Sequence, residues 1–314
     1  EKMADKSKAK EEMVRAGVPV VPGSKGAVRT LDEGKKIARE IGYPIMAKAS
    51  AGGGGRGMRL IKEEKDFDSQ YLAASSEALA AFGDGTMYLE RFINNPRHIE
   101  VQVIGDSHGN AIHIGERDCS LQRRHQKVIE ESPAILLNDE TRAKLHEVAV
   151  KATKYLKYEG AGTFEFLADD KQNIYFMEMN TRLQVEHPVS EMVSGLDIIE
   201  WMIKVAEGEK LPPQESIRFR GHAIECRITA EDPNNFLPCP GKITQWMVPG
   251  GRNVRVDSHI YTNYIVPPYY DSMIGKLIVW GRDRNKAINI MKRALAEFEV
   301  EGIKTTIPFH QSLI

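Results

Sequence analysis

Two glutamates on opposite arms of a predicted β-hairpin are the residues of this sequence that most clearly indicate chemistry. The hairpin spans Gly162 to Asn180 and turns at the polar segment 169–173. A register symmetric about that turn places Glu165 directly opposite Glu178. Two like charges so placed repel each other by roughly 0.2–1 kcal/mol unless a cation lies between them. The pattern therefore predicts a cation site, with two solvent-facing glutamates as the alternative.

The residues beside this hairpin favour magnesium bound next to a phosphate. Mg²⁺ takes one or two protein carboxylates together with phosphate oxygens of a substrate. Asn180 adds an oxygen ligand on the same face of the hairpin. The segment Thr181–Pro188 is predicted to be a loop that ends at its proline, and its arginine, glutamine and glutamate suit a small anion and a general base. A plain surface turn rarely collects so many long polar side chains.

A glycine-rich segment predicts the part of the chain that covers the phosphates. It matches G-x-G-x-x-G at Gly52, Gly54 and Gly57. A dinucleotide-binding motif would need a helix after these glycines, whereas 58–62 continues as a strand. We predict a flexible flap whose backbone N–H groups close over phosphates, with a mobile surface loop as the alternative. Lys48 ends the preceding apolar strand, where a phosphate would supply the anion that a buried ammonium group needs.

A dense polar run, Glu116–Lys127, follows a first predicted hairpin at 98–114. Charge runs of this kind are usually solvated loops. Beside a phosphate flap and a metal hairpin, the run instead predicts hydrogen-bond donors for the ribose and phosphates of a nucleotide.

The elements that must position these residues alternate without a regular β-α-β period, which favours an α+β fold. Hydrophobic spacing predicts helices at 7–16, 31–41, 66–82, 139–155 and 284–298. Besides the two hairpins, it predicts strands at 43–49, 58–62, 87–93, 220–229, 242–248, 253–261 and 276–280. Gly208–Pro213 is predicted to be a linker, so we expect a domain boundary there.

Length and composition limit the classes of protein that fit. A chain of 314 residues is long enough for two or three packed units. The 43 basic and 44 acidic residues nearly balance, so no strong field attracts nucleic acid or a membrane surface. Three widely spaced cysteines, Cys119, Cys226 and Cys239, predict a reducing, cytoplasmic setting. No apolar run approaches the roughly 20 residues that span a bilayer.

Taken in order along the chain, these segments closely resemble biotin carboxylase. The resemblance rests on the Lys48–Met58 segment, the polar run Glu116–Lys127, Phe176–Pro188 and the late segment Pro267–Lys276. It covers nearly the whole sequence and implies an ATP-grasp core with a glycine-rich lid subdomain, followed by a mainly β biotin carboxylase C-terminal domain. The implied parts are a linker helix at 1–19, the lid subdomain at 20–92, the core subdomain at 93–207 and the C-terminal domain at 208–314.

The resemblance also implies a role for individual residues. The implied ATP-binding set is Lys6, Lys48, Gly53, Gly54, Gly55, Glu90, Arg91, Ile93, His98, Gln122, His125, Glu165 and Leu167. The implied ligands for Mg²⁺ or Mn²⁺ are Glu165, Glu178 and Asn180. The implied bicarbonate and biotin set is Lys127, Arg182, Gln184, Val185, Glu186 and Arg255, of which Lys127, Arg182, Glu186 and Arg255 are the expected catalytic residues.

The implied activity is that of a ligase that carboxylates biotin with bicarbonate at the expense of ATP, the first half-reaction of acetyl-CoA carboxylase in fatty acid biosynthesis or of a related carboxylase. Glu186 would deprotonate bicarbonate, which attacks the γ-phosphate of ATP to give carboxyphosphate. Arg255 would steady the biotin enolate that captures CO₂. The implied partners are a biotin carboxyl carrier protein or domain, a carboxyltransferase component and, at full length, a second copy.

The sequence departs from the biotin carboxylase pattern at its start. Members of that family carry a further α/β domain before the helix at residue 7, so we expect this chain alone to be weakly active or inactive. The alternatives are an isolated ATP-binding fragment with little activity and another bicarbonate-activating ATP-grasp ligase. The sequence has no biotin attachment motif, so the carrier is expected in another chain or in another part of a longer one.

Overall fold

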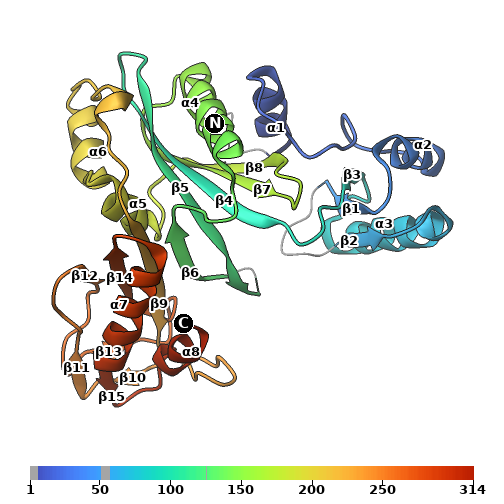
Figure 1. The fold of residues 1–314 in the computed structure, drawn as a ribbon. Coiled ribbons are helices and arrows are strands. Elements are labelled where there is room, and N and C mark those ends of the chain that lie inside the picture. The colour runs from blue at the N-terminus through green and yellow to red at the C-terminus, as the bar shows by residue number, and fades with distance from the viewer. Residues whose placement is uncertain (1–5, 51–56, 125) are drawn as a thin grey trace. The chain divides into compact units, whose positions relative to one another are not determined.

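The computed structural model describes residues 6–50, 57–124 and 126–314, which form two compact units (Figure 1). The first unit comprises the described residues up to Pro96 together with Asp169–Met177. The second unit comprises Arg97–Ala168 and Glu178–Ile314. No helix in the described part of the chain is long and apolar enough to cross a membrane.

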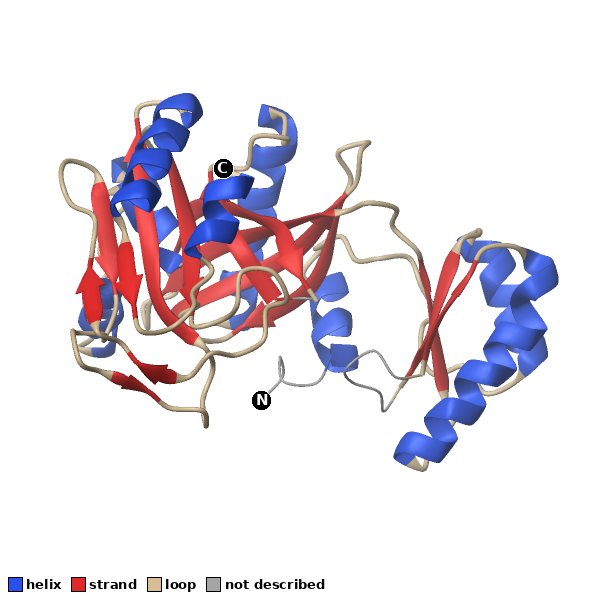
Figure 2. Ribbon diagram, turned by 90° about the horizontal axis from the view of Figure 1, so that it is seen from below, coloured by secondary structure: helices blue, strands red, loops and turns tan. Residues whose placement is uncertain are grey.

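The first unit is built on a three-stranded antiparallel sheet in the order β2-β1-β3. Its strands are β1 (Ile45–Ala49), β2 (Met58–Ile61) and β3 (Met87–Arg91). Its helices are α1 (Lys6–Arg15), α2 (Leu31–Ile41) and α3 (Phe67–Phe82), with a 3₁₀ turn at Glu64–Asp66. Figure 2 shows α2 and α3 together on one face of this sheet. Ile45, Leu89 and Phe67 belong to the apolar core between the two layers.

An eight-stranded sheet in the order β12-β14-β9-β6-β5-β4-β7-β8 organises the second unit, although residues 174–177 of its last strand, β8, are assigned to the first unit. The pairings from β12 through β7 are all antiparallel. The strands are β4 (Arg97–Gly105), β5 (Ala111–Arg123), β6 (Gln126–Ser132), β7 (Gly160–Ala168), β8 (Ile174–Asn180), β9 (His222–Thr229), β12 (Val254–Asp257) and β14 (Met273–Gly281). Most side chains of β4, β5 and β7 are buried, so charges on these strands need partners inside the protein.

Helices and two small sheets complete the second unit. The helix α4 packs on β4 and β5, α5 packs on β9 and β14, and α7 packs on β14. The helices are α4 (Asp139–Leu156), α5 (His187–Ser194), α6 (Ile198–Ala206), α7 (Arg284–Glu297) and α8 (Ile307–Leu313), with a 3₁₀ turn at Gln214–Ser216. The small sheets pair β10 (Gly241–Lys242) with β13 (Ile265–Val266) and β11 (Gln245–Met247) with β15 (Glu299–Glu301).

The α+β fold and most of the elements predicted from hydrophobic spacing are confirmed. The helix expected at 31–41 has those bounds, because Thr30 caps its first turn and Gly42 ends it at a positive φ of 81°. The helix expected at 139–155 ends one residue later, at Leu156. The four-part division at residues 20, 93 and 208 stays a prediction. The large sheet contains strands from both sides of residue 208, since β9 pairs with β6.

Two expectations about polar segments are corrected. A loop interpretation of Glu116–Lys127 is wrong, because β5 continues to Arg123 and β6 begins at Gln126. Most charges of this run are tolerated in a strand because they form ion pairs: Glu116 with Arg142, Asp118 with Arg97, and Arg117 and Lys127 with Glu100. The loop predicted at Thr181–Pro188 ends two residues earlier, at Glu186, because Pro188 lies in the first turn of α5, where a proline has no required N–H bond to lose.

Gly105, the last residue of β4, lies so close to a second backbone segment that any side chain there would collide with it. A Cβ atom at this position would lie 1.9 Å from the carbonyl oxygen of Tyr158. We expect Gly105→Ala to lower the free energy of unfolding by about 1–3 kcal/mol, measured by urea denaturation. Gly250→Ala is the matched control, because its Cβ would meet no atom within 4 Å. Equal unfolding midpoints for both variants would contradict this account of β4.

Candidate functional site

A row of three charged residues crosses the middle of the large sheet. Arg117 of β5 pairs in register with Glu100 of β4, and Glu100 pairs with Glu165 of β7. Arg117 and Glu100 have no exposed surface, and Glu165 is 5% exposed. Two carboxylates at this depth require cations beside them.

Two further cations lie against this row. The Nε2 atom of His98 lies 3.0 Å from one carboxylate oxygen of Glu100 and 3.0 Å from one of Glu165. The ammonium group of Lys127, from β6, contacts Glu100 and lies 3.5 Å from Glu165. The two glutamates are therefore held together by shared positive charge.

The shared charge shifts the pKa values of the groups in the row. Burial lowers the pKa of His98, but its contacts with Glu100 and Glu165 outweigh burial and raise the pKa to about 9. Burial raises the pKa of Glu100, but His98, Arg117 and Lys127 outweigh it and hold that pKa well below its usual range. At neutral pH, His98 is therefore an imidazolium and Glu100 a carboxylate.

Arg117 connects the row to the loop that follows β8. Its guanidinium donates to Glu100 at 3.1 Å and to Gln184 at 2.8 Å. It also donates to Gln102 at 2.8 Å, Ser190 at 3.1 Å and Thr163 at 3.2 Å. The expectation that the polar run supplies donors to a nucleotide is thus wrong for Arg117, because its donors are already bound inside the protein.

The carboxylate of Glu186, in the same loop, is held between two cations. Lys127 donates to one of its oxygens at 2.6 Å and Arg227 of β9 donates to the other at 3.0 Å. Glu186 is 2% exposed. Lys276 of β14 donates to the carbonyl oxygen of Val185 at 2.6 Å, which fixes the backbone beside it. Strands β6, β9 and β14 therefore all position this loop.

Glu165 and Asn180 fit a magnesium site. The side-chain amide of Asn180 donates to Glu165 Oε1 at 2.7 Å, and that of Gln184 donates to the same oxygen at 2.8 Å. The Asn180 side-chain oxygen therefore lies within reach of a cation on Glu165, and Mg²⁺ prefers such oxygen ligands. Glu178 lies on the adjacent strand β8 and is half-buried. Its direct opposition to Glu165 stays a prediction.

The expected nucleotide-binding residues of the first unit already pair with one another. Lys48 donates to one carboxylate oxygen of Glu90 at 2.6 Å, and Lys10 donates to the other at 2.9 Å. The inference that Lys48 needs a phosphate as its anion is therefore wrong, because Glu90 is that anion. Lys48 is also 39% exposed at its side chain rather than buried. Arg91 ends β3, and Ile93 is buried two residues later.

The structure brings some of the remaining predicted residues to the row and leaves others outside it. Gln122 lies 3.2 Å from His98 Nδ1, and Leu167 is the cross-strand neighbour of His98. Arg182 is exposed and donates to the carbonyl oxygen of Leu183 at 3.2 Å. The predicted residues outside the described part of the chain are Gly53, Gly54, Gly55, His125 and the side chain of Lys6.

Arg255 lies in a second charged group on β12. Its guanidinium donates to Asp257 at 2.8 Å and to Glu191 of α5 at 2.7 Å.

The arginine in contact with Glu186 is Arg227, which sequence reasoning did not select. A charge placed between apolar residues of a buried strand is the signal that could have found it. That signal is present in the segment Glu225–Ile228 and in the segment His98–Val101 around Glu100.

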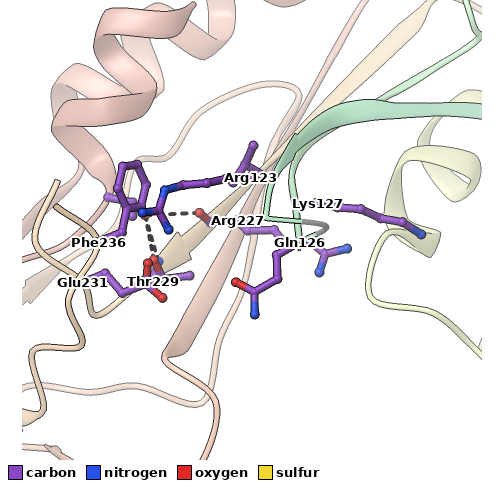
Figure 3. A pocket seen from close by; sticks show the side chains of 9 residues that line it. Arg123, Gln126, Lys127, Arg227, Thr229, Glu231 and Phe236 are labelled. Carbon is purple, nitrogen blue, oxygen red and sulfur yellow. Dashed lines mark hydrogen bonds between the residues drawn. The ribbon is translucent and has the colours of Figure 1, made fainter. Parts of the chain in front are cut away.

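A small cavity of about 40 Å³ lies beside Lys127 and Arg227 (Figure 3). Figure 3 shows Gln126 and Thr229 on its wall, near the ends of β6 and β9. The cavity has room for a few water molecules or a small anion. Lys127 and Arg227 both belong to its lining, together with Glu231, and Figure 3 shows the Lys127 side chain directed away from the other residues drawn.

Replacing Arg117 tests whether it holds the row together. We expect Arg117→Met to lower the free energy of unfolding by about 3–5 kcal/mol, because Glu100 loses a buried partner. Adding Glu100→Gln to that variant is expected to restore part of the loss, which a double-mutant cycle in urea measures. The control is Arg293→Met, which breaks an exposed pair with Glu297. Equal losses from both arginine replacements would refute the role of Arg117.

The pKa of His98 provides a second test, made without Mg²⁺ or nucleotide. We expect its ring protons to titrate near pH 9 by NMR, while the buried ring of His310 titrates at about 4. The folded pKa exceeds the unfolded value of about 6.5, so His98 stabilises the fold fully below that pH. Its contribution is lost as the pH rises through about 9. A His98 titration below pH 6.5 would show that the carboxylates do not hold its proton.

Two family models of known proteins match separate segments of the chain. Residues 5–214 match the family model of the carbamoyl-phosphate synthase L chain, ATP binding domain, and residues 225–314 match that of the biotin carboxylase C-terminal domain. The chain is 57% identical to a biotin carboxylase of Nostoc sp., over 99% of this chain and 70% of the relative. It is 53% identical to biotin carboxylase 1 of Bacillus subtilis, over 100% of this chain and 70% of the relative.

Solved structures give the same result. A biotin carboxylase from Campylobacter jejuni, solved as a β,γ-ATP complex, is 68% identical with a TM-score of 0.90, over 99% of this chain and 70% of that one. A second structure is the biotin carboxylase domain of 2-oxoglutarate carboxylase from Hydrogenobacter thermophilus, solved with MgADP, ADP and bicarbonate. It is 52% identical with a TM-score of 0.88, over 99% of this chain and 69% of that one. The chain therefore belongs to the biotin carboxylase family.

Proposed function

We propose that this chain carries the site for ATP-dependent carboxylation of biotin with bicarbonate. The observation that carries the proposal is Glu186, a buried carboxylate held between Lys127 and Arg227. Such an arrangement attracts a small anion and places a proton acceptor beside it. Family membership supports the same reaction.

Glu186 becomes a stronger base when bicarbonate enters. In the structure, Lys127 and Arg227 stabilise the Glu186 carboxylate. A bicarbonate anion takes over part of these contacts, so less positive charge compensates Glu186 and its affinity for a proton rises. Glu186 then accepts the bicarbonate proton, and the bicarbonate oxygen attacks the γ-phosphorus of ATP. The bond to the ADP oxygen breaks, which gives carboxyphosphate and ADP.

Glu165 and Asn180 would hold Mg²⁺, which supplies positive charge for the phosphates of ATP. Gln184 and Asn180 both donate to Glu165 Oε1 and so orient the carboxylate. Arg117 in turn holds Gln184. Glu165 and Asn180 of the expected metal set, and Lys127, Gln184 and Glu186 of the expected bicarbonate set, thus belong to one hydrogen-bonded network.

ATP binding in the first unit requires an exchange of partners. We infer that a phosphate draws Lys48 away from Glu90, to which Lys48 donates at 2.6 Å. Glu90 then keeps Lys10 as its cation. The released carboxylate oxygen becomes available to the amino group of the adenine, the part of ATP that the family resemblance gives to Glu90 and to Arg91–Ile93.

Biotin needs a cation for its enolate, and we propose Arg227 for that role beside or in place of Arg255. Arg227 contacts Glu186, whereas Arg255 is bound by Asp257 and Glu191. A hollow of about 430 Å³, lined by Phe236 and Tyr270 among others, shares four lining residues with the small cavity at Lys127: Arg123, Gln126, Glu231 and Phe236. It is large enough for a biotin ring, and it adjoins the small cavity that Arg227 lines.

The remaining proposals concern the cellular setting. The biotin would come on a carrier protein or domain, and a carboxyltransferase component and a second copy of the chain would complete the enzyme. A cytoplasmic location is consistent with three cysteines that form no disulfide in the structure.

Replacing Glu186 tests the proposed reaction. We expect Glu186→Gln to slow bicarbonate-dependent ADP release by roughly 10²–10⁴-fold, because glutamine keeps the shape and loses the base. Arg282→Met, an exposed arginine away from the site, is the matched control. Calorimetry with MgATP separates binding from turnover. If bicarbonate-dependent ADP release is unchanged in Glu186→Gln, the proposed role of Glu186 is disproved. If the chain does not bind MgATP at all, the only remaining function is that of a scaffold fragment.

A further inference from the structure

A second pair of buried glutamates lies beside the site and has no part in the reaction described above. Glu130 of β6 and Glu225 of β9 are direct cross-strand neighbours in the antiparallel register. Neither side chain has any exposed surface. Directly paired residues have Cβ atoms about 4.5–5.5 Å apart, so the two carboxyl groups are within reach of each other.

The hydrogen bonds of this pair are incomplete. Glu130 Oε1 accepts from Arg227 Nε at 2.6 Å. The other oxygen of Glu130 and both oxygens of Glu225 are buried without a hydrogen-bond partner among the described residues. A carboxylate has no donor of its own, so two ionised groups would leave three acceptor atoms unpaired at this depth. Such an arrangement would be very costly.

The neighbouring cations are already engaged by other groups. Arg227 binds Glu186 as well as Glu130, so its guanidinium already has two carboxylate partners. Lys276, opposite Arg227 on β14, donates to the carbonyl oxygen of Val185 and lies 3.7 Å from Asp257. Neither cation makes an ion pair with Glu225.

The helix packed over these strands supplies no further positive charge to Glu225. On α5, His187 Nδ1 lies 2.8 Å from the carbonyl oxygen of Gln184, and the pKa of His187 is lowered by burial. Glu191 of the same helix binds Arg255. The nearest thiol, Cys226, is buried, and burial raises its pKa well above the usual value, so it stays neutral.

The pKa shifts of the two glutamates follow from this environment. Burial raises the pKa of Glu225 well above its usual range, and the charges of Glu130 and Glu186 raise it further. Burial raises the pKa of Glu130 to about 7, although Arg227 opposes the shift. A proton on this pair therefore persists into the neutral range.

We propose that Glu130 and Glu225 share one proton, which Glu225 holds as a hydroxyl that donates to the free oxygen of Glu130. The pair then carries one negative charge, which Arg227 balances while its other nitrogen reaches Glu186. Glu225 is in this sense a positioning residue for Arg227. Loss of the shared proton adds a second negative charge behind Arg227 and draws the guanidinium away from Glu186. The existence of the shared proton does not depend on the proposed function. The effect of that proton on catalysis by Glu186 does rest on the proposed function.

The pH dependence of stability tests the shared proton directly. A glutamate titrates near pH 4.3 when unfolded, so above that pH the native pair binds one proton more than the unfolded chain. Raising the pH then favours unfolding, and the unfolding constant rises about tenfold per pH unit until the pair ionises. We expect Glu225→Gln, which keeps a donor and has no proton to lose, to abolish this rise between pH 5 and 7. Urea denaturation at each pH measures it.

The matched control is Glu209→Gln, which removes an exposed carboxylate and is expected to keep the pH dependence of the parent chain. Parallel stability curves for the parent chain and Glu225→Gln would overturn the proposal. Infrared spectroscopy of the parent chain gives a second measurement that needs no variant. We expect the carbonyl band of a protonated carboxylic acid at pH 7, and a spectrum without such a band would also overturn it.

The effect on Arg227 is tested by the pH profile of bicarbonate-dependent ADP release. We expect the activity of the parent chain to fall as the pair ionises at alkaline pH, and the activity of Glu225→Gln to persist to higher pH. Identical profiles would overturn the link to Arg227. If the chain releases no ADP under any condition, the proposed function fails, while the stability curves and the infrared band still decide whether the proton is shared.

Discussion

The burial of a guanidinium inside β5 is the constraint on which the rest of the site depends. Arg117 has no contact with water, so every one of its donors must find an acceptor within the protein. Those acceptors come from β4, β7, the loop after β8 and α5. A planar group with donors in fixed directions leaves these elements little freedom to shift. The position of Gln184, and through it that of Glu165, follows from that geometry.

The chain places more charge in the core than its nearly neutral composition suggests. Glu100, Glu165, Glu186, Glu130 and Glu225 are all nearly or fully buried, and most of them have a cation in contact. Ion pairs of this kind add little net stability compared with apolar packing. Their value lies in the exchange of partners, because an anionic substrate can replace a carboxylate at Lys127, which is largely buried, or at Lys48, which is already partly exposed.

Local patterns in the sequence predicted the local structure well. Hydrophobic spacing and turn residues that lie within a few positions in the sequence predicted the helix at 31–41, the strand at 58–61 and both early hairpins. The neighbours Asn180 and Glu186 could likewise be assigned to one site, because they lie on one short stretch of chain. The irregular alternation of helices and strands predicted the α+β class, the family resemblance implied the ATP-grasp fold, and the comparisons confirmed both.

Pairings between distant segments were beyond the reach of the sequence patterns. Nothing local shows that Glu100 lies beside Glu165, that Glu90 is the partner of Lys48, or that Arg227 rather than Arg255 reaches Glu186. Each pairing is set by strand order, and strand order results from the packing of the whole sheet. The polar run around Arg117 was misread for the same reason, since a charged segment is typical of a surface until its partners are known.

The order of strands in the large sheet also has a consequence for how the chain is made. β6 lies in the interior of that sheet, but one of its neighbours, β9, begins at His222. While the ribosome is still adding residues before that point, β6 is an open edge whose Glu130 has neither Glu225 nor Arg227 beside it. Exposed edges of this kind invite pairing with other chains. The segment that matches the ATP-binding family model ends at residue 214, so it leaves the ribosome before β9, the missing neighbour of β6, has been made.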